Sequence, residues 1–315
     1  MTEKHKVIHL ADHMSETRQV PIRHAFSSII EPGWAEMVHK FRPIVSATAM
    51  AVEINVLCGL ALRITRLAIA SDLLARKGLD EEGHILQRSA TEAYVNLGYI
   101  FHCGPRRRPK KGSQREKDTH GLCLQFCAYA NIAYLKLISK DPDRVRETFK
   151  RRRGLSDSEY DALHAEHLRL AEEAQRTYGC VKDRWHSMNI QDMAQKLLDD
   201  PPPFMNLDLG KMLLSSFVSS NSAVHADALS IRSQYMDHGT DLMELVLKPD
   251  VVGGDVVASL AVDGWRAIGW YLKEEDWVNE MVNAQLSHML KERYAAAGQP
   301  PMHVDIPTFR SEEVS

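Results

Sequence analysis

The stretch EEGHILQRSATEAYVNLGYIFH, residues 81–102, decides the fold class because its apolar residues recur at helical spacing. One apolar stripe is formed by Leu86, Ala90, Ala93, Leu97 and Ile100, and a second group by Ile85, Val95 and Tyr99. A repeat of this kind places each group on one side of an α-helix. The stretch therefore predicts a helix that is apolar on two sides.

Helical spacing also dominates the rest of the chain, and no run of alternating strand residues occurs. Ser156 and Glu159 have the spacing of a capping box, Asn189 is a suitable N-cap, and Gly78 is a suitable helix end. Further helices are predicted at 43–77, 118–140, 141–153, from 156 onward, from 189 onward, and at 206–236, 254–273 and 275–296. The predicted fold is all-α, a bundle of about eight to nine helices with long antiparallel core helices and no significant sheet.

The domain organisation is predicted from the polar and proline-containing stretches. Residues 1–32 end in EPGW and are expected to form an N-terminal arm. Residues 33–296 are expected to form a single α-helical domain that carries a basic loop at 104–117, and residues 297–315 a flexible C-terminal tail. A chain of 315 residues is long enough to bury a sizeable core.

The composition is that of an ordinary soluble protein, with 44% hydrophobic and 26% charged residues. A net charge of -3 argues against a dedicated polyanion binder overall, although basic residues can still cluster locally. The five scattered cysteines indicate reduced thiols in a cytoplasmic protein. The most membrane-like window, residues 44–62, contains Glu53 and Asn55, which favours a buried core helix. We expect no signal peptide and no membrane association.

Arg88 and Glu92 lie one helical turn apart on the second apolar side of the 81–102 segment. Their order, with the arginine first, is the weaker one for a helix-stabilising pair. One interpretation is a partly buried salt bridge that fixes packing. The other is a charged pair that lines a polar cleft, since buried charges need partners.

His225 lies at the edge of the apolar stripe of the 206–236 segment, next to a run of small polar residues that includes Ser220 and Asn221. Such side chains compete for backbone hydrogen bonds and can mark a bend or a pocket. His225 is therefore either a hydrogen-bonded core histidine or a group that works in a site.

Three segments carry a family resemblance: LQRSATEAYVNLGYIF (86–101), RWHSMNIQDMAQKLL (184–198) and LLSSFVSSNSAVHADALSI (213–231). In order and spacing they resemble a widespread family of uncharacterised bacterial helical proteins, which is itself similar to the HEPN helical bundles. The resemblance covers roughly residues 40–240. It implies a helical fold and points to Arg88, Glu92, Trp185 and His225.

Two functions follow as hypotheses. In the first, a HEPN-like cleft acts on RNA or a nucleotide, in stress or phage defence by analogy with the family. His225 would transfer a proton, Arg88 would stabilise phosphate charge and Glu92 would orient either of them, while Ser220, Asn221 and Trp185 would bind the ligand. In the second, the protein is a non-catalytic helical module that binds a protein or small molecule, and Arg88, Glu92 and His225 only fix packing. Under either hypothesis, a homodimer is one expected assembly.

The sequence has two basic clusters, of which the loop at 104–117 is either a phosphate-binding loop or simply a solvated loop, and the one at 150–153 is explained by its place at a helix end. The 104–117 loop carries Arg106, Arg107, Arg108, Lys110 and Lys111, and KRRR at 150–153 ends a helix, where cations suit the macrodipole. Metal signals are weak, because HAEH at 164–167 and His120 with two nearby cysteines lack a complete ligand set. We expect no metal and no cofactor.

Overall fold

The computed structural model describes residues 25–47, 52–75, 79–104, 119–180, 184–205 and 252–296. These residues contain nine α-helices, one π-helical turn and no strand, which confirms the all-α prediction. The helices are α1 (Ala25–Ala47), α2 (Val52–Ala75), α3 (Asp80–Gly98), α4 (Thr119–Lys140), α5 (Pro142–Arg153), α6 (Asp157–Tyr178), α7 (Ile190–Asp199), α11 (Val252–Leu272) and α12 (Glu275–Ala296), and the π-helical turn η2 (Tyr99–Cys103) directly follows α3.

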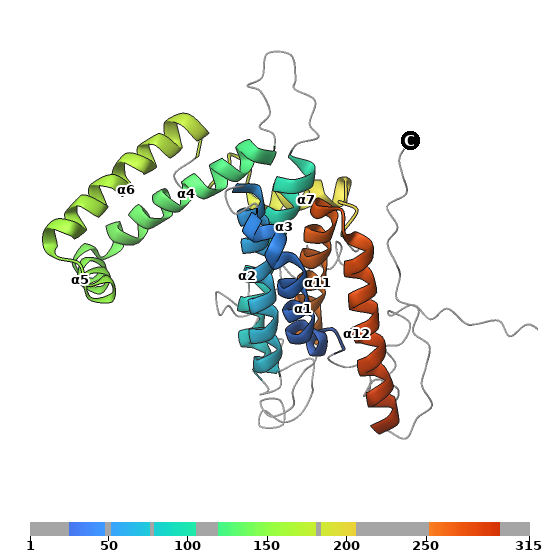
Figure 1. Ribbon diagram of the computed structural model, residues 1–315. Coiled ribbons are helices and arrows are strands. Elements are labelled where there is room, and N and C mark those ends of the chain that lie inside the picture. Colours follow the sequence, from blue (N-terminus) through green and yellow to red (C-terminus); the bar gives the residue numbers. More distant parts are fainter. Residues whose placement is uncertain are drawn as a thin grey trace, which may run out of the picture.

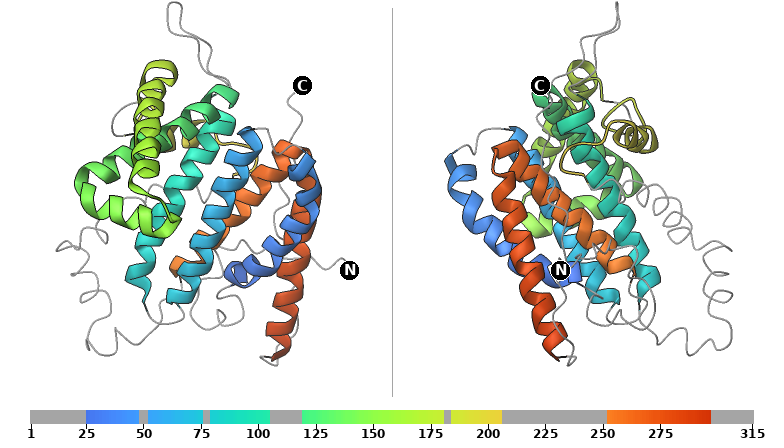
Figure 2. Two further views of the ribbon diagram at one scale, coloured as in Figure 1. Left: turned by 60° about the vertical axis from the view of Figure 1, so that its left-hand side comes forward. Right: turned by 90° about the vertical axis from the view of Figure 1, so that its right-hand side faces the viewer.

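The described helices form a bundle and an arm (Figure 1). In the bundle, α2 packs against α3 and α11, and α1 and α12 pack against α11 and against each other. In the arm, α4 extends from one end of the bundle, α5 lies at the outer end, and α6 returns along α4 (Figures 1 and 2). The helix α7 packs against α3 and η2. Helices α2 and α3 are joined by a short connection, so they run antiparallel.

The main core draws on both ends of the chain, from Ile29 in α1 to Tyr94 in α3 and Trp265 in α11. Two described helices, α2 and α4, are long and apolar enough to cross a membrane by length and composition alone. The apolar side of α2 lies in the main core, as the sequence predicts for the segment around Glu53. The first turn of α4 also joins this core through Leu122.

A buried polar network links three helices of the bundle. The Tyr94 hydroxyl donates to Asp263 at 3.3 Å, and Asp263 forms an ion pair of 3.1 Å with Arg266 one turn along α11. The Arg266 Nε–H donates to the side-chain oxygen of Asn279 on α12 at 3.0 Å. Burial raises the pKa of Tyr94 well above its ordinary value, with a smaller contribution from Asp263, so this hydroxyl remains a donor.

The first helix begins earlier than the sequence suggests. Residues 25–32 belong to the segment 1–32 that was expected to precede the helical domain, yet they form the first turns of α1. Pro32 and Pro43 lie inside that helix. Ile29 and Ile30 are buried in the main core, and Met37 follows them on the same helix. Their burial offsets the cost of an interior proline, about 3 kcal/mol.

Two predicted helices are divided in the structure. The segment predicted as one helix over 43–77 contributes residues 43–47 to α1 and residues 52–75 to α2. These two helices pack against each other, which a single straight helix could not do. The helix predicted over 81–102 continues as α3 and then widens into η2, where the Gly104 N–H donates to the Tyr99 carbonyl at 2.8 Å.

Local capping signals are confirmed where the structure describes them. Ser156 and Glu159 form the predicted capping box at the start of α6. Asn189 caps α7 by accepting the backbone N–H of Asp192 at 2.8 Å. Gly154 ends α5 with a φ of 66°, in the left-handed region that favours glycine. The arm has its own small core of Ile132, Ala171, Ala174 and Cys180.

Candidate functional site

Arg88 and Glu92 form the predicted pair on α3, with 3.2 Å between Arg88 Nε and Glu92 Oε1. The exposed fractions of their side chains are 26% and 42%, so the pair lies near the surface and is not in the core. Asn96 follows one turn later. Residues spaced by four share one face of a helix, so Arg88, Glu92 and Asn96 form a polar line along α3.

Trp185 closes this polar line at its Asn96 end. The indole N–H of Trp185 donates to the side-chain oxygen of Asn96 at 2.8 Å. The ring is buried and makes edge contacts with Tyr99 and Phe126, at centroid distances of 6.2 and 5.4 Å. Three of the residues that the sequence singles out, Arg88, Glu92 and Trp185, are thus brought to one face of α3. Trp185 holds the segment before α7 against α3, and its N–H is used in the hydrogen bond to Asn96.

His186 is a candidate that the sequence analysis missed. Its ring packs on Tyr99 and Trp185, at centroid distances of 5.2 and 5.3 Å. Its Nδ1 accepts the backbone N–H of Met188 at 3.1 Å, so the neutral ring carries its proton on Nε2. The available signal was its position directly after Trp185, inside a segment that already stood out for its resemblance.

Most of the other predicted site residues lie outside the described part of the chain. These are Ser220, Asn221 and His225, and in the basic loop Arg106, Arg107, Arg108, Lys110 and Lys111. The proximity of His225 to the Arg88–Glu92 pair therefore stays a prediction.

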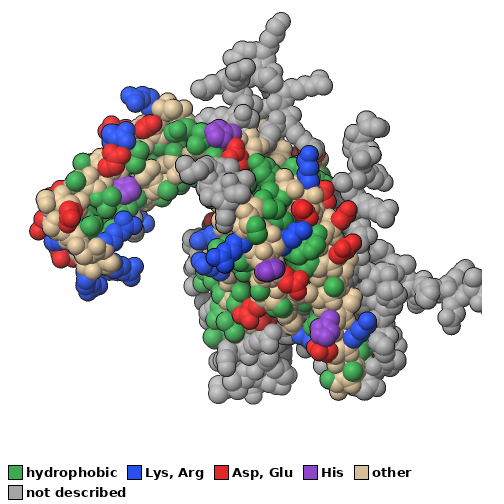
Figure 3. Space-filling model, in the orientation of Figure 1, with side chains coloured by type: hydrophobic (Ala, Val, Ile, Leu, Met, Phe, Trp, Pro, Cys, Tyr) green, Lys and Arg blue, Asp and Glu red, His purple; other side chains and the backbone are tan. Residues whose placement is uncertain are grey.

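The outer end of the arm is strongly basic. Lys150, Arg151, Arg152 and Arg153 form the last turn of α5, and blue side chains gather at this end of the arm in Figure 3. Lys150 is bound to Asp157 at 2.9 Å, and Arg153 lies over the ring of Phe149. Within the described residues, Arg151 and Arg152 are exposed and have no acidic partner.

Ion pairs next to this turn show how the neighbouring charges are balanced. Arg146 binds Asp157 at 2.8 Å and Asp161 at 2.9 Å. Hydrogen bonds from Lys150 and Arg146 lower the pKa of Asp157, and the same contacts raise the pKa values of both cations. The two aspartates are therefore engaged by Arg146 and Lys150, which leaves the charge of the following two arginines uncompensated.

A second pair of exposed arginines lies on α2. Arg63 and Arg66 are on the side of α2 opposite its core residues, and among the described residues neither has an acidic partner. Positive charge therefore occurs on both the bundle and the arm, although the net charge of the chain is -3.

Residues 54–242 match a family of unknown function, DUF5677. The chain belongs to this family. No curated protein and no solved structure shows a significant match to the chain. The DUF5677 segment includes nearly all of α2, and α3 to α7, and with them the polar line, the arm and the basic turn. Helices α1, α11 and α12 lie outside it and complete its core, for example through the contact between Tyr94 and Asp263.

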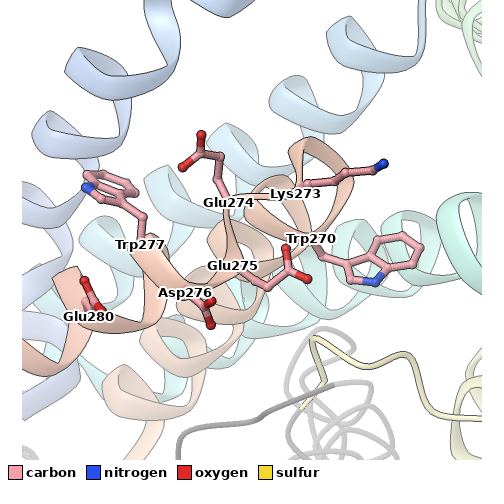
Figure 4. A pocket seen from close by; sticks show the side chains of 7 residues that line it. All are labelled: Trp270, Lys273, Glu274, Glu275, Asp276, Trp277 and Glu280. Carbon is pink, nitrogen blue, oxygen red and sulfur yellow. The ribbon is translucent and has the colours of Figure 1, made fainter. Parts of the chain in front are cut away.

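Outside the DUF5677 segment, an acidic hollow of about 820 Å³ lies at the turn between α11 and α12. Trp270 and Trp277 lie on either side of Glu275, and the side chains around the hollow point in different directions (Figure 4). Lys40 binds Glu274 at 3.3 Å and lies over the Trp277 ring. Its polar groups thus do not converge on a common point.

The thiols near α4 are poor nucleophiles. Burial raises the pKa of Cys123 to about 12, and burial also raises the pKa values of Cys58 and Cys127. A thiol reacts as its thiolate, so these residues stay in the unreactive form at neutral pH. His120, which precedes two of these cysteines, is bound to Glu53 at 2.7 Å.

Proposed function

We propose that this DUF5677 protein is a cytoplasmic RNA-binding protein that holds RNA phosphates on the basic end of its arm. The observation that carries the proposal is the pair Arg151 and Arg152, which are exposed and have no acidic partner in the described part of the chain, whereas the charges of Lys150 and Arg146 are balanced. Cations at a helix end interact well with the macrodipole, which accounts for one or two of them. Four in a row exceed that need, and the arginines among them are suited to bidentate phosphate contacts.

The polar line on α3 is the second part of the proposal. Arg88, held by Glu92, would bind a phosphate or ribose of the RNA, and His225 would act on it as in a HEPN-like enzyme. The support is the family resemblance together with the alignment of Arg88, Glu92 and Asn96 on one face of α3. If the protein is instead a non-catalytic module, the same residues only fix packing.

The binding experiment uses the full chain and a fluorescent single-stranded RNA, with anisotropy measured over a range of salt concentrations. The double variant Arg151→Ala/Arg152→Ala is compared with Arg169→Ala. Arg169 is an exposed arginine of the same arm, but it is bound to Glu166 and Glu173. We expect the double variant to lower the slope of log affinity against log salt by about 1.4, since each lost phosphate contact on a single strand contributes about 0.7. The control should keep the wild-type slope.

Equal slopes for the double variant and the control, or no binding of RNA by the wild type, would overturn the proposal for the arm. Cleavage is measured separately on the same RNA with the wild type, His225→Ala and Arg88→Ala. Loss of cleavage in both variants, with binding retained by His225→Ala, supports the HEPN-like activity. RNA that binds but stays intact with the wild-type protein shows that the protein is a binding module.

A further inference from the structure

Three different metal-ligating side chains meet where η2 contacts the end of α7. His102, Cys103 and Asp200 each offer one ligand atom, and these atoms all lie within 4.8 Å of one another. The distance between His102 Nε2 and Asp200 Oδ2 is 3.5 Å. His102 and Cys103 are buried, whereas Asp200 is exposed. The cluster therefore has an inner side within the core and an outer side open to solvent.

The π-helical turn positions the two buried members. Its i→i+5 hydrogen bond, from the Gly104 N–H to the Tyr99 carbonyl, widens the turn and rotates each residue less about the helix axis. The neighbouring side chains of His102 and Cys103 can then reach a common point. Single π-helical turns are rare and often occur at functional sites.

The end of α7 supplies the third member. Asp200 is the C-cap of α7, and the three prolines at 201–203 prevent the helix from continuing. Without a metal, the Cys103 thiol faces the carbonyl oxygens of Lys196 and Asp200 as a donor, at 3.6 and 3.5 Å, which holds η2 against this helix end, and the thiol releases its proton when it binds an ion. The three donors thus come from two elements that pack firmly against each other.

The chemistry of the three ligand atoms limits which metal ion the cluster can bind. A nitrogen, a thiolate sulfur and a carboxylate oxygen suit a borderline metal such as Zn²⁺ better than Mg²⁺ or Ca²⁺, which take oxygen ligands. Bond lengths of about 2.0–2.3 Å around a tetrahedral Zn²⁺ place the atoms of such a ligand set about 3.3–3.5 Å apart, so a shift of about 1.5 Å or less closes the cluster. The exposed Asp200 side chain can make that shift.

The charge of the site also suits Zn²⁺. A thiolate and a carboxylate together neutralise a divalent cation, so the metal introduces no net charge beside the buried histidine. Lys196 is the nearest cation along α7, but its ammonium lies over the ring of Tyr99, 6.0 Å from the centroid, and it forms no ion pair with Asp200 within the described residues.

We propose that His102, Cys103 and Asp200 form a three-ligand Zn²⁺ site. With three protein ligands, a tetrahedral ion has one position left for water or a substrate atom, on the solvent side of Asp200. The site is independent of the proposed RNA contacts at the arm. It departs from the expectation from sequence of no metal site.

The test uses the full untagged chain in two separate titrations. One sample is titrated with Zn²⁺, and a second, metal-free sample is titrated with Co²⁺ as a spectroscopic substitute. Wild-type protein should bind one Zn²⁺ per chain at this site, and Co²⁺ should produce a thiolate-to-metal charge-transfer band that added Zn²⁺ removes. Cys103→Ser should abolish the band, and Cys127→Ser should keep it. The band matters because histidines elsewhere in the chain can bind metal without producing it.

A second pair of variants keeps the test valid if Cys103→Ser does not fold. Asp200→Asn changes an exposed residue and should weaken Zn²⁺ binding by about tenfold or more. Asp199→Asn changes the exposed neighbour, which is bound to Gln195, and should bind as the wild type does. No thiolate band in the wild type, or equal affinities for these two variants, would refute the site. Neither result depends on RNA, so failure here leaves the proposed function untouched.

Discussion

The indole N–H of Trp185 donates a hydrogen bond of 2.8 Å to the side chain of Asn96, and this single contact ties the segment before α7 to the polar line of α3. The ring of Trp185 also packs against Phe126 of α4. One residue therefore joins the bundle, the first turns of the arm and α7.

We predict that the hydrogen bond between Trp185 and Asn96 is a measurable part of that junction. Trp185→Phe keeps an aromatic ring but leaves Asn96 without its donor, and should lower the free energy of unfolding by about 1–2 kcal/mol. In a double-mutant cycle with Asn96→Ala, the coupling should be about 1 kcal/mol. Urea unfolding of the four proteins measures it. A coupling near zero would show that only the ring contacts matter.

The buried network around Arg266 gives a second prediction. Arg266→Leu leaves the Asp263 carboxylate buried beside Tyr94 without its ion-pair partner, and should destabilise the fold by about 3–5 kcal/mol. Arg169→Ala breaks an exposed ion pair and should cost less than about 1 kcal/mol. Both are measured by urea unfolding. Similar losses for the two variants would contradict the view that burial sets the strength of these pairs.

A pH dependence is predicted for the arm. His167 donates from Nδ1 to Asn131 at 2.8 Å and packs against the ring of Tyr134. Burial lowers the pKa of His167, and the nearby Arg153 and His164 lower it further. The fold thus favours the neutral ring. The neutral ring of His167 contributes fully to stability above about pH 6.5, which is the pKa of a histidine in the unfolded chain. This contribution is lost as the pH falls from there through the lower pKa of His167 in the folded chain.

The measurement is the urea midpoint of the wild type and of His167→Gln between pH 8 and pH 5. The wild type should lose stability over this range, and the variant should lose less. The carboxylate of Asp157, whose pKa is lowered by Lys150 and Arg146, contributes only at lower pH, near and below about 4. Parallel curves for the two proteins would rule out His167 as the cause.

The sequence predicts the helices well where local signals act, and less well where long-range packing decides. The caps at Ser156 and Asn189 depend on neighbouring residues alone, and both are confirmed. The start of α1 depends on where Ile29 and Ile30 find a core, which no local pattern encodes. The prolines of that helix therefore gave a false boundary.

In the candidate sites, too, the sequence predicts what depends on local spacing and misses what depends on long-range contacts. The Arg88–Glu92 pair follows from helical spacing and is formed in the structure. The cluster of His102 and Cys103 with Asp200 joins residues almost a hundred positions apart, across a π-helical turn that has no sequence signature in this chain. Residue spacing cannot reveal a site of that kind.

The contact between α1 and α11 supplies the last prediction. A Cβ on Gly33 would lie 2.7 and 2.8 Å from two ring carbons of Trp265. The ring cannot move away easily, because it is fully buried and its N–H donates to Thr65 at 3.0 Å. Gly33→Ala should therefore overpack this contact and lower the free energy of unfolding by about 1–3 kcal/mol.

Gly59 provides the matched control for that substitution. It is also a helical glycine, but it lies on the exposed side of α2 with no atom within 4 Å of an added Cβ. Gly59→Ala should raise the free energy of unfolding by about 0.5–1 kcal/mol, because alanine loses less backbone entropy in a helix. Urea unfolding of both variants gives opposite signs if α1 is held tightly against Trp265. A stabilising effect at both positions would mean that α1 can move away from the ring at little cost.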